Sequence, residues 1–268
     1  MKAIDILNAF LDRADWVDRA NTVDRIIIGD PEKEVRSALV TWISSLAAVR
    51  AAIARHADML VTHEPTFYVH RQEHEKWEAS PTTREKKALI DNSGLVVLRI
   101  HDVWDHMPEA GIPWAWARFL GLGEKPAAIS EDEYQHRYDI APVTLGAFAG
   151  RIARRVRGLG ESCVQLIGEG RRRVSRVGIG TGCLCDIPTF EGMGCDVSIV
   201  CDDGTAYWSH LQRAADAGHH VLRVNHGTSE EPGMITLTQY INEHLPGVQA
   251  VHLPHGCCYR VVRAGGPA

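Results

Sequence analysis

Short apolar runs alternate with helix-like segments along the chain, and this alternation constrains the fold more than any other feature of the sequence. The run "SALVTWIS" at residues 37–44 is rich in β-branched and large apolar residues, as strands are. Residues 45–58 place their apolar side chains three and four positions apart, which is the helical period. The runs at 59–62 and 92–100 follow as further strands. Strand–helix–strand order predicts an α/β fold with parallel pairing in part of a sheet.

The second half of the chain repeats this alternation after a polar stretch. Residues 123–140 contain Pro126 and few apolar side chains, and we interpret them as a boundary. Beyond it, "VTLGAF" at residues 143–148 predicts a strand, and a helix is expected from about Pro232 to Leu245. We therefore predict an α/β fold of two domains with mixed sheets flanked by helices. The predicted parts are an N-terminal half at residues 1–130, a C-terminal half at 131–262 and a tail at 263–268.

The composition is that of a globular protein and argues against a polyanionic partner. Hydrophobic residues make up 45% of the chain and charged residues 24%, which is ordinary for a protein that buries a core. The net charge of −5 argues against nucleic-acid binding. Two basic stretches, at residues 150–158 and 170–176, are interpreted as solvated faces of a helix and a turn.

Compartment and redox state follow from what the sequence lacks. There is no apolar run of the ~18 residues that a membrane span needs. The first residues carry charges in place of the apolar core of a secretory signal, so we expect a cytoplasmic protein. The seven cysteines are an odd number without a CxxC pair, which predicts reduced thiols and gives no tetrahedral zinc spacing. A thiol redox protein that uses Cys183 and Cys185 is a separate hypothesis.

Three apolar runs end in imidazole and carboxylate groups. These fragments are "LVTHEP" at residues 60–65, "LRIHDVWDH" at 98–106 and "VLRVNHGTSEE" at 221–231. In open α/β sheets, ligands bind outside the carboxyl ends of the strands. Each fragment alone has a structural explanation, because histidines at strand ends often only form hydrogen bonds and acids in turns often cap helices. Glu230, for example, could simply favour a helix N-terminus.

Taken together, these side chains predict a metal site. Mixed imidazole and carboxylate donors suit Zn, Fe, Mn, Co or Ni without selecting one of them. A single catalytic zinc takes three or four protein ligands, whereas this chain offers more. The surplus favours two divalent transition-metal ions.

The ordered fragments "THEP", "HDVWD" and "NHGTSE" resemble the Nif-three-like dinuclear metal-centre family, whose members are also called GTP cyclohydrolase I type 2 homologues. That family shows His-His-Pro after an early strand, then His-x-x-x-Asp, and finally Gly-His followed four residues later by Glu. The segments "DRIIIG" and "GCDVSIVCDD" are also similar to family segments, so the resemblance covers roughly residues 20–256.

The resemblance implies a ligand set and a catalytic residue. It implies a metal site in the cleft between the N- and C-terminal segments. His101 is either a proton shuttle or a further ligand, and we take it as the catalytic candidate. Asp102 has no counterpart in the family pattern, and neighbours on an extended chain point to opposite sides, so we do not expect it beside His101 at one ion. The implied metal ligands are His63, Glu64, Asp105, His226 and Glu230.

Two positions depart from the family pattern. Glu64 stands where the family has its second histidine, and Asn225 stands where it has glycine. Glutamate keeps a donor but adds negative charge, which favours harder ions such as Mn²⁺ or Fe.

The resemblance implies a metal-dependent hydrolase of the GTP cyclohydrolase I type 2 kind, which uses a metal-bridging water on a nucleotide or related heterocycle as its small-molecule substrate. It also implies a homohexamer. The alternative is a non-catalytic metal-binding scaffold or regulatory protein, because a closed site with all positions filled by protein is inert.

Other features keep two explanations each. Trp116 lies in a helix whose aromatic side chains form either a contact face or, as we favour, part of the core. The glycines of "GIGTG" at residues 178–182 either cradle a phosphate or permit a tight turn. His70 and His74 lie in a polar loop where most histidines are solvated, though they could reach a site at the strand ends.

Overall fold

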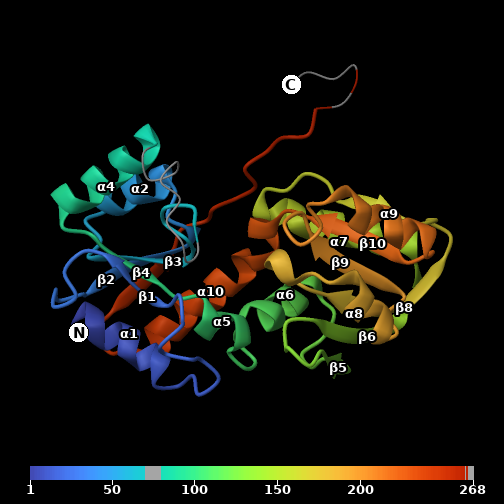
Figure 1. The fold of residues 1–268 in the computed structure, drawn as a ribbon, viewed down its shortest axis with the longest axis horizontal. Helices are drawn as coiled ribbons and strands as arrows, with labels where there is room; N and C mark the ends of the chain where they lie inside the picture. The colour runs from blue at the N-terminus through green and yellow to red at the C-terminus, as the bar shows by residue number, and fades with distance from the viewer. Residues whose placement is uncertain (70–79, 263, 265–268) are drawn as a thin grey trace. The chain divides into compact units, whose positions relative to one another are not determined.

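The structure is a computed structural model that describes residues 1–69, 80–262 and 264. The chain forms two compact units, each with one mixed sheet flanked by helices, which confirms the predicted fold class (Figure 1). The polar stretch at 123–140 lies within the second unit, where it holds strand β5 and the start of β6. Unit 1 comprises Met1–Gly111 and Met234–His255, and unit 2 comprises Ile112–Gly233 and Gly256–Ala268.

The sheet of unit 1 has the strand order β1-β4-β3-β2-β11. Pairing is parallel from β4 through β3 and β2 to β11, as the strand–helix–strand order predicts, and β1 is antiparallel to β4. The central strand β3 is buried along its whole length, because strands flank it and helices cover both faces. The strands are β1 (Arg25–Ile28), β2 (Ser37–Ile43), β3 (Met59–Glu64), β4 (Val96–Arg99) and β11 (Gln249–His252).

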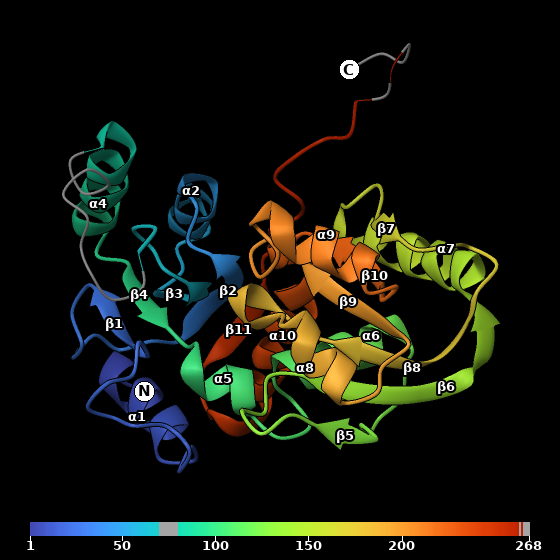
Figure 2. The same cartoon turned by 45° about the vertical axis from the view of Figure 1, so that its right-hand side comes forward.

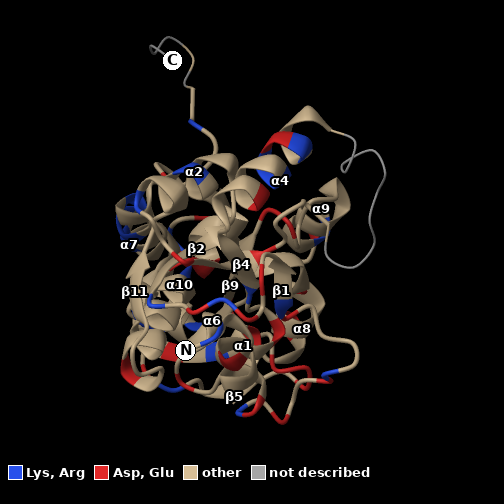
Figure 3. Cartoon of the chain, turned by 90° about the vertical axis from the view of Figure 1, so that its left-hand side faces the viewer, with Lys and Arg blue, Asp and Glu red and all other residues tan. Residues whose placement is uncertain are grey.

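The helices of unit 1 cover the two faces of this sheet. Helices α2 and α4 lie together over one face, and α1 lies on the other (Figure 1). Basic and acidic residues are interspersed along the ribbon of α4, and Lys86 is the one of them that is buried (Figure 3). The rings of Phe10, Trp104 and Tyr240 pack together and join α1, α5 and α10. These helices are α1 (Ala3–Leu11), α2 (Leu46–Ala54), α4 (Pro81–Ser93), α5 (Asp102–His106) and the later part of α10 (His226–His244).

The sheet of unit 2 has the order β5-β6-β8-β9-β10-β7, with β8, β9 and β10 parallel and the other pairs antiparallel (Figure 2). Trp116 is fully buried in the hydrophobic core of this unit, which confirms that its helix is a core helix. The strands are β5 (Ala128–Ile129), β6 (His136–Thr144), β7 (Gln165–Ile167), β8 (Arg173–Ile179), β9 (Val197–Cys201) and β10 (His220–Val224). The helices are α6 (Ile112–Leu120), α7 (Leu145–Val156), α8 (Ile187–Gly192), α9 (Trp208–Asp216) and the start of α10.

Two predicted elements differ from the structure. The strand expected at 143–148 is wrong beyond Thr144, because the Thr144 side chain accepts the Ala147 N–H and so starts helix α7. The helix expected from Pro232 begins earlier, at His226, with Pro232 inside it. The first N–H groups of a helix have no partner within the helix, and the Asp202 carboxylate accepts that of His226. The helix can therefore begin at His226 and does not need a proline in its first turn.

Within the described residues, no helix combines the length and apolar character needed to cross a membrane.

Lys86 on α4 supplies a test of unit 1. Its buried Nζ donates to the Thr66 carbonyl at 2.6 Å and lies 4.1 Å from the centre of the Tyr68 ring. Burial lowers the pKa of Lys86 from 10.5 to about 8. Between these two pH values the unfolded chain holds a proton that the folded protein has released, so the stability contributed by this group rises with pH.

We expect the Lys86→Met variant to lack this pH dependence. Relative to the variant, the unmodified protein should gain up to about 3 kcal/mol in free energy of unfolding between pH 7 and pH 10. Urea unfolding at the two pH values measures this, with exposed Lys87→Met as the control. Parallel stability curves for the protein and Lys86→Met would contradict the assignment.

Candidate metal centre

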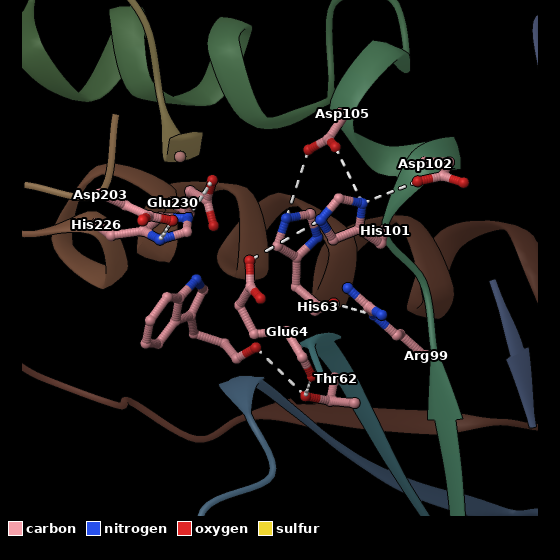
Figure 4. Close-up of polar contacts among 12 residues, drawn as sticks. Thr62, His63, Glu64, Arg99, His101, Asp102, Asp105, Asp203, His226 and Glu230 are labelled. Atoms are coloured by element: carbon pink, nitrogen blue, oxygen red, sulfur yellow. Dashed lines mark hydrogen bonds and ion pairs between the residues drawn. The ribbon is translucent and has the colours of Figure 1, made fainter. Parts of the chain in front are cut away.

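The parallel pairing of β3 and β4 brings the first two predicted fragments together. Thr62 is paired with Arg99 in the register, so the residues that follow these two strands leave the same edge of the sheet. Here the rings of His63 and His101 stack, with 4.4 Å between their centres and 9° between their planes (Figure 4). Two histidines far apart in the sequence thus become neighbours through strand pairing alone.

Asp105 connects the two imidazoles. It lies one turn into α5, with Oδ1 3.4 Å from His63 Nε2 and Oδ2 3.1 Å from His101 Nδ1 (Figure 4). Glu64 extends the group, because its Oε1 lies 3.9 Å from His101 Nε2. One donor atom each from His63, Glu64 and His101 lies within 4.8 Å of the other two, which is close enough to hold one metal ion.

The donors of this group are buried and held by the backbone. His63, Glu64 and Asp105 are all buried. His63 Nδ1 is 3.1 Å from the Ile100 carbonyl oxygen, which fixes the plane of its ring. Arg99 Nε donates to the His63 carbonyl at 2.9 Å and places a buried guanidinium beneath the group. These contacts orient the donor atoms before any ion binds.

Asp102 lies beside His101, and the expectation that it points away is wrong. Its Oδ1 is 3.0 Å from His101 Nδ1, and its Oδ2 accepts from Thr22 Oγ1 at 2.8 Å and from the Val23 N–H at 3.1 Å. The expectation assumed an extended chain, whereas α5 begins at Asp102 and turns it back. With His101 and Asp105, it forms a second group of potential metal ligands.

Asp24 also supports this site, although the sequence analysis missed it. Its carboxylate accepts the backbone N–H groups of His101 and Val103, the latter at 2.8 Å, and so holds the start of α5. Asp24 precedes strand β1, whereas the donors predicted from the sequence all follow strands.

The charges of this group favour a cation. Burial would lower the pKa of His101, but the charge of Asp105 and the hydrogen bond to Asp102 raise it to about 9. Burial would raise the pKa of Asp102, but the hydrogen bonds from His101 and Thr22 hold it well below its usual range. Without a metal, His101 is therefore protonated at neutral pH beside the ionised Asp102, and a metal ion that bound to His101 would have to compete with that proton.

Unit 2 holds the third predicted fragment. His226 follows β10 and opens α10, so Glu230 lies one turn further on the same helix face. His226 Nε2 is 3.0 Å from Glu230 Oε1, and His226 Nδ1 is 3.4 Å from Asp203 Oδ2 (Figure 4). Burial would lower the pKa of His226, but the charge of Glu230 raises it well above its usual value.

Asp203 was missed, although a signal for it was present. It follows the buried run "CDVSIVC", just as the predicted donors follow their strands. The neighbouring Asp202 accepts the His226 N–H at 2.8 Å and the Asn225 Nδ2 hydrogen at 2.9 Å. Asn225, which replaces the family's glycine, thus adds a hydrogen bond to the support of His226.

The glycines of "GIGTG" serve close packing. A β-carbon on Gly178 would lie 2.5 Å from Phe190 Cδ1. Gly182 has a φ of +59°, and a β-carbon there would lie 3.2 Å from both Glu230 Oε1 and His226 Nε2. Of the two explanations for this segment, the left-handed φ of Gly182 supports the tight turn, and the close contact at Gly178 is a further reason for glycine.

Two further sets of candidates came from the sequence. His70 and His74 lie outside the described residues. Cys183 is exposed, whereas Cys185 is buried with its Sγ 3.6 Å from that of Cys201, so Cys183 and Cys185 do not form the thiol pair.

Comparison with known proteins agrees with the fold and the motifs. The family model Duf34/NIF3 (NGG1p interacting factor 3) matches residues 1–255, and no curated protein matches the chain. Protein ybgI, described as of unknown function, has a similar structure, with a TM-score of 0.78 and 17% identity over 96% of this chain and 100% of its own. Hypothetical protein SA1388 of Staphylococcus aureus has a TM-score of 0.78 and 16% identity over 98% and 99% of the two chains. A Bacillus cereus protein related to NIF3 has a TM-score of 0.74 and 12% identity over the same shares.

Gly182 provides a test of the unit 2 donors. We expect Gly182→Ala to weaken metal binding about tenfold, because the new methyl group displaces His226 and Glu230. Elemental analysis after equilibration at a series of free Mn²⁺ or Zn²⁺ concentrations measures the change. Gly94→Ala is the matched control, since Gly94 has a similar φ of +66° but nothing within 4 Å of a β-carbon. Equal metal affinity in the two variants would contradict the role of these donors.

Proposed function

Because this chain belongs to the Duf34/NIF3 family, we propose that it is a dinuclear metal-binding protein that acts as a metal-dependent hydrolase. The observation that carries this proposal is the buried Asp105 carboxylate between the imidazoles of His63 and His101. Such a cluster is expensive to bury without a cation, since neighbouring carboxylates repel each other in a medium of low dielectric.

The donor chemistry fits divalent transition metals. Imidazole nitrogens and carboxylate oxygens together suit Zn, Fe, Mn, Co and Ni, and the carboxylates favour the harder of these ions. His101 is held at Nδ1 by Asp102 and is assigned to the reaction. The proposed ligands are His63, Glu64, Asp105, His226 and Glu230.

When bound, such ions polarise the bond under attack and make water a stronger nucleophile at neutral pH. The chain's own residues then manage the proton. His101 keeps a proton on Nδ1, which donates hydrogen bonds to the carboxylates of Asp102 and Asp105. Its Nε2 exchanges the reacting proton with the leaving group. Asp24 keeps His101 in place through its backbone N–H.

A nucleotide or related heterocycle is the proposed substrate class. Besides the family resemblance, unit 2 offers aromatic surfaces for stacking. Tyr207 and Trp208 are 61% and 69% exposed, and their ring centres are 5.8 Å apart. They follow Asp203 closely in the chain, and planar bases stack well on such side chains.

The second candidate function is a metal-binding scaffold without turnover. The burial of His63, Glu64 and Asp105 favours it, because a closed site leaves no position for a substrate. In either case we propose the homohexamer that the resemblance implies, which light scattering on the purified protein would test.

Metal content tests the proposed ligands. We expect His63→Ala and Glu230→Ala each to lower the affinity for the metal at least about tenfold, and therefore to lower the amount of bound metal. Inductively coupled plasma mass spectrometry measures the ions per chain, with two expected for the unmodified protein. The controls are exposed residues of the same types, His210→Ala and Glu243→Ala. Unchanged metal content in both ligand variants would remove the basis of the proposal.

Turnover separates the two candidate functions. We expect His101→Gln to keep most of the bound metal but to lose about 100-fold in kcat, because the proton donor is gone. The assay follows ring hydrolysis of nucleotides and cyclic amides by ultraviolet absorbance. Loss of metal from His101→Gln would make His101 a ligand, and a metal-loaded protein inactive on the whole panel would favour the scaffold.

A further inference from the structure

Unit 2 contains a cavity at the opposite end of its sheet from His226. Its volume is about 500 Å³, within the range of small-molecule sites. Part of its lining comes from the starts of the parallel strands, with Arg172 before β8, Arg173 at its first position, Asp196 before β9 and His219 before β10. His226 follows the other end of β10, five residues of strand away, which is roughly 15 Å at the usual rise. The cavity is therefore a separate feature of the sheet.

The carboxylates of this cavity already have cationic partners. Asp196 Oδ1 accepts from Arg176 Nη2 at 2.8 Å, and its Oδ2 accepts the Ser175 N–H at 2.8 Å. Glu191 Oε2 pairs with Arg213 Nη2 at 3.0 Å. Both acids are therefore already paired with arginines outside the cavity lining.

Arg172 brings a positive charge that these acids do not neutralise. Its side chain is exposed and has no partner among the residues that the structure describes, whereas Arg173 donates to the Pro142 carbonyl at 2.8 Å. Arg172 belongs to the basic stretch at 170–176, which was expected to be a solvated turn. One member of that basic stretch, Arg172, therefore lines a cavity.

Two histidines add fixed hydrogen-bonding groups. His219 is only 8% exposed, and its Nε2 lies 2.7 Å from Ser198 Oγ, which sets the orientation of the ring. His220 packs its Nδ1 against Gly168, because a β-carbon built on that glycine would lie only 2.5 Å from this nitrogen. The other ring nitrogen of His220 is therefore the one available to a ligand in the cavity. Burial lowers the pKa of both imidazoles, and both are neutral at pH 7. A neutral imidazole can donate one hydrogen bond without adding charge.

We propose that this cavity binds the phosphate group of a small molecule, with the Arg172 guanidinium as the charged partner and His219 and His220 as hydrogen-bonding partners. A guanidinium presents several N–H groups in a planar fork that matches two phosphate oxygens. A carboxylate ligand has one oxygen fewer for the imidazoles to reach. The chemistry is the same for free phosphate and for a phosphomonoester.

Titration of the full-length, metal-loaded protein with inorganic phosphate tests the proposal. The readout is the imidazole signals of His219 and His220 in NMR spectra, which report on this cavity and not on the metal donors. We expect saturable shifts, and we expect Arg172→Ala to weaken phosphate binding about tenfold. The control is Arg171→Ala, an exposed neighbour of equal charge that does not line the cavity, with an expected change within about twofold.

Two results would overturn the proposal. One is an equal loss of affinity in Arg172→Ala and Arg171→Ala, which would reduce the effect to general charge attraction. The other is the absence of any shift in the two histidines while phosphate binds elsewhere. A parallel titration with adenosine monophosphate distinguishes the sources, since tighter binding than inorganic phosphate indicates a phosphomonoester and equal binding indicates free phosphate.

Discussion

The parallel pairing of β3 with β4 is the constraint on which the rest of unit 1 depends. It sets His63 and His101 at one sheet edge, and Arg99 at the end of β4 reinforces it by donating to the His63 carbonyl. Burial lowers the pKa of this guanidinium, and nearby carboxylates, Glu64 and Asp24 foremost, oppose the shift. One buried cation therefore makes it possible for several acids to gather around two imidazoles. Two of the acids that stabilise Arg99, Glu64 and Asp105, are also proposed metal ligands.

Much of this arrangement could be predicted from the sequence, because apolar runs report strands and the residues after them report the sheet edge. His63, His101 and Asp105 come together for that reason. The sequence did not reveal Asp24, since its role depends on a backbone N–H that only the folded chain brings near. Nor did it reveal that α5 starts at Asp102, because a helix of one turn has no periodicity to detect.

Unit 2 uses the same principle at both ends of its parallel strands. The carboxyl ends lead into Gly182, Asp203 and His226, and a β-carbon on Gly182 would lie only 3.2 Å from the His226 imidazole. The opposite ends lead into arginine and histidine side chains around a cavity. The two groups of polar side chains are thus separated by the length of the strands.

Strand β11 has a consequence for how the protein is made. It follows the main segment of unit 2, Ile112–Gly233, in the chain, yet it pairs with β2 as the edge strand of the unit 1 sheet. During synthesis the first sheet must wait for its last strand until residues 249–252 leave the ribosome, whereas Ile112–Gly233 emerges as one continuous piece. The middle of the polypeptide can therefore mature before the beginning does, and the nascent β2 edge stays open to mispairing in the meantime.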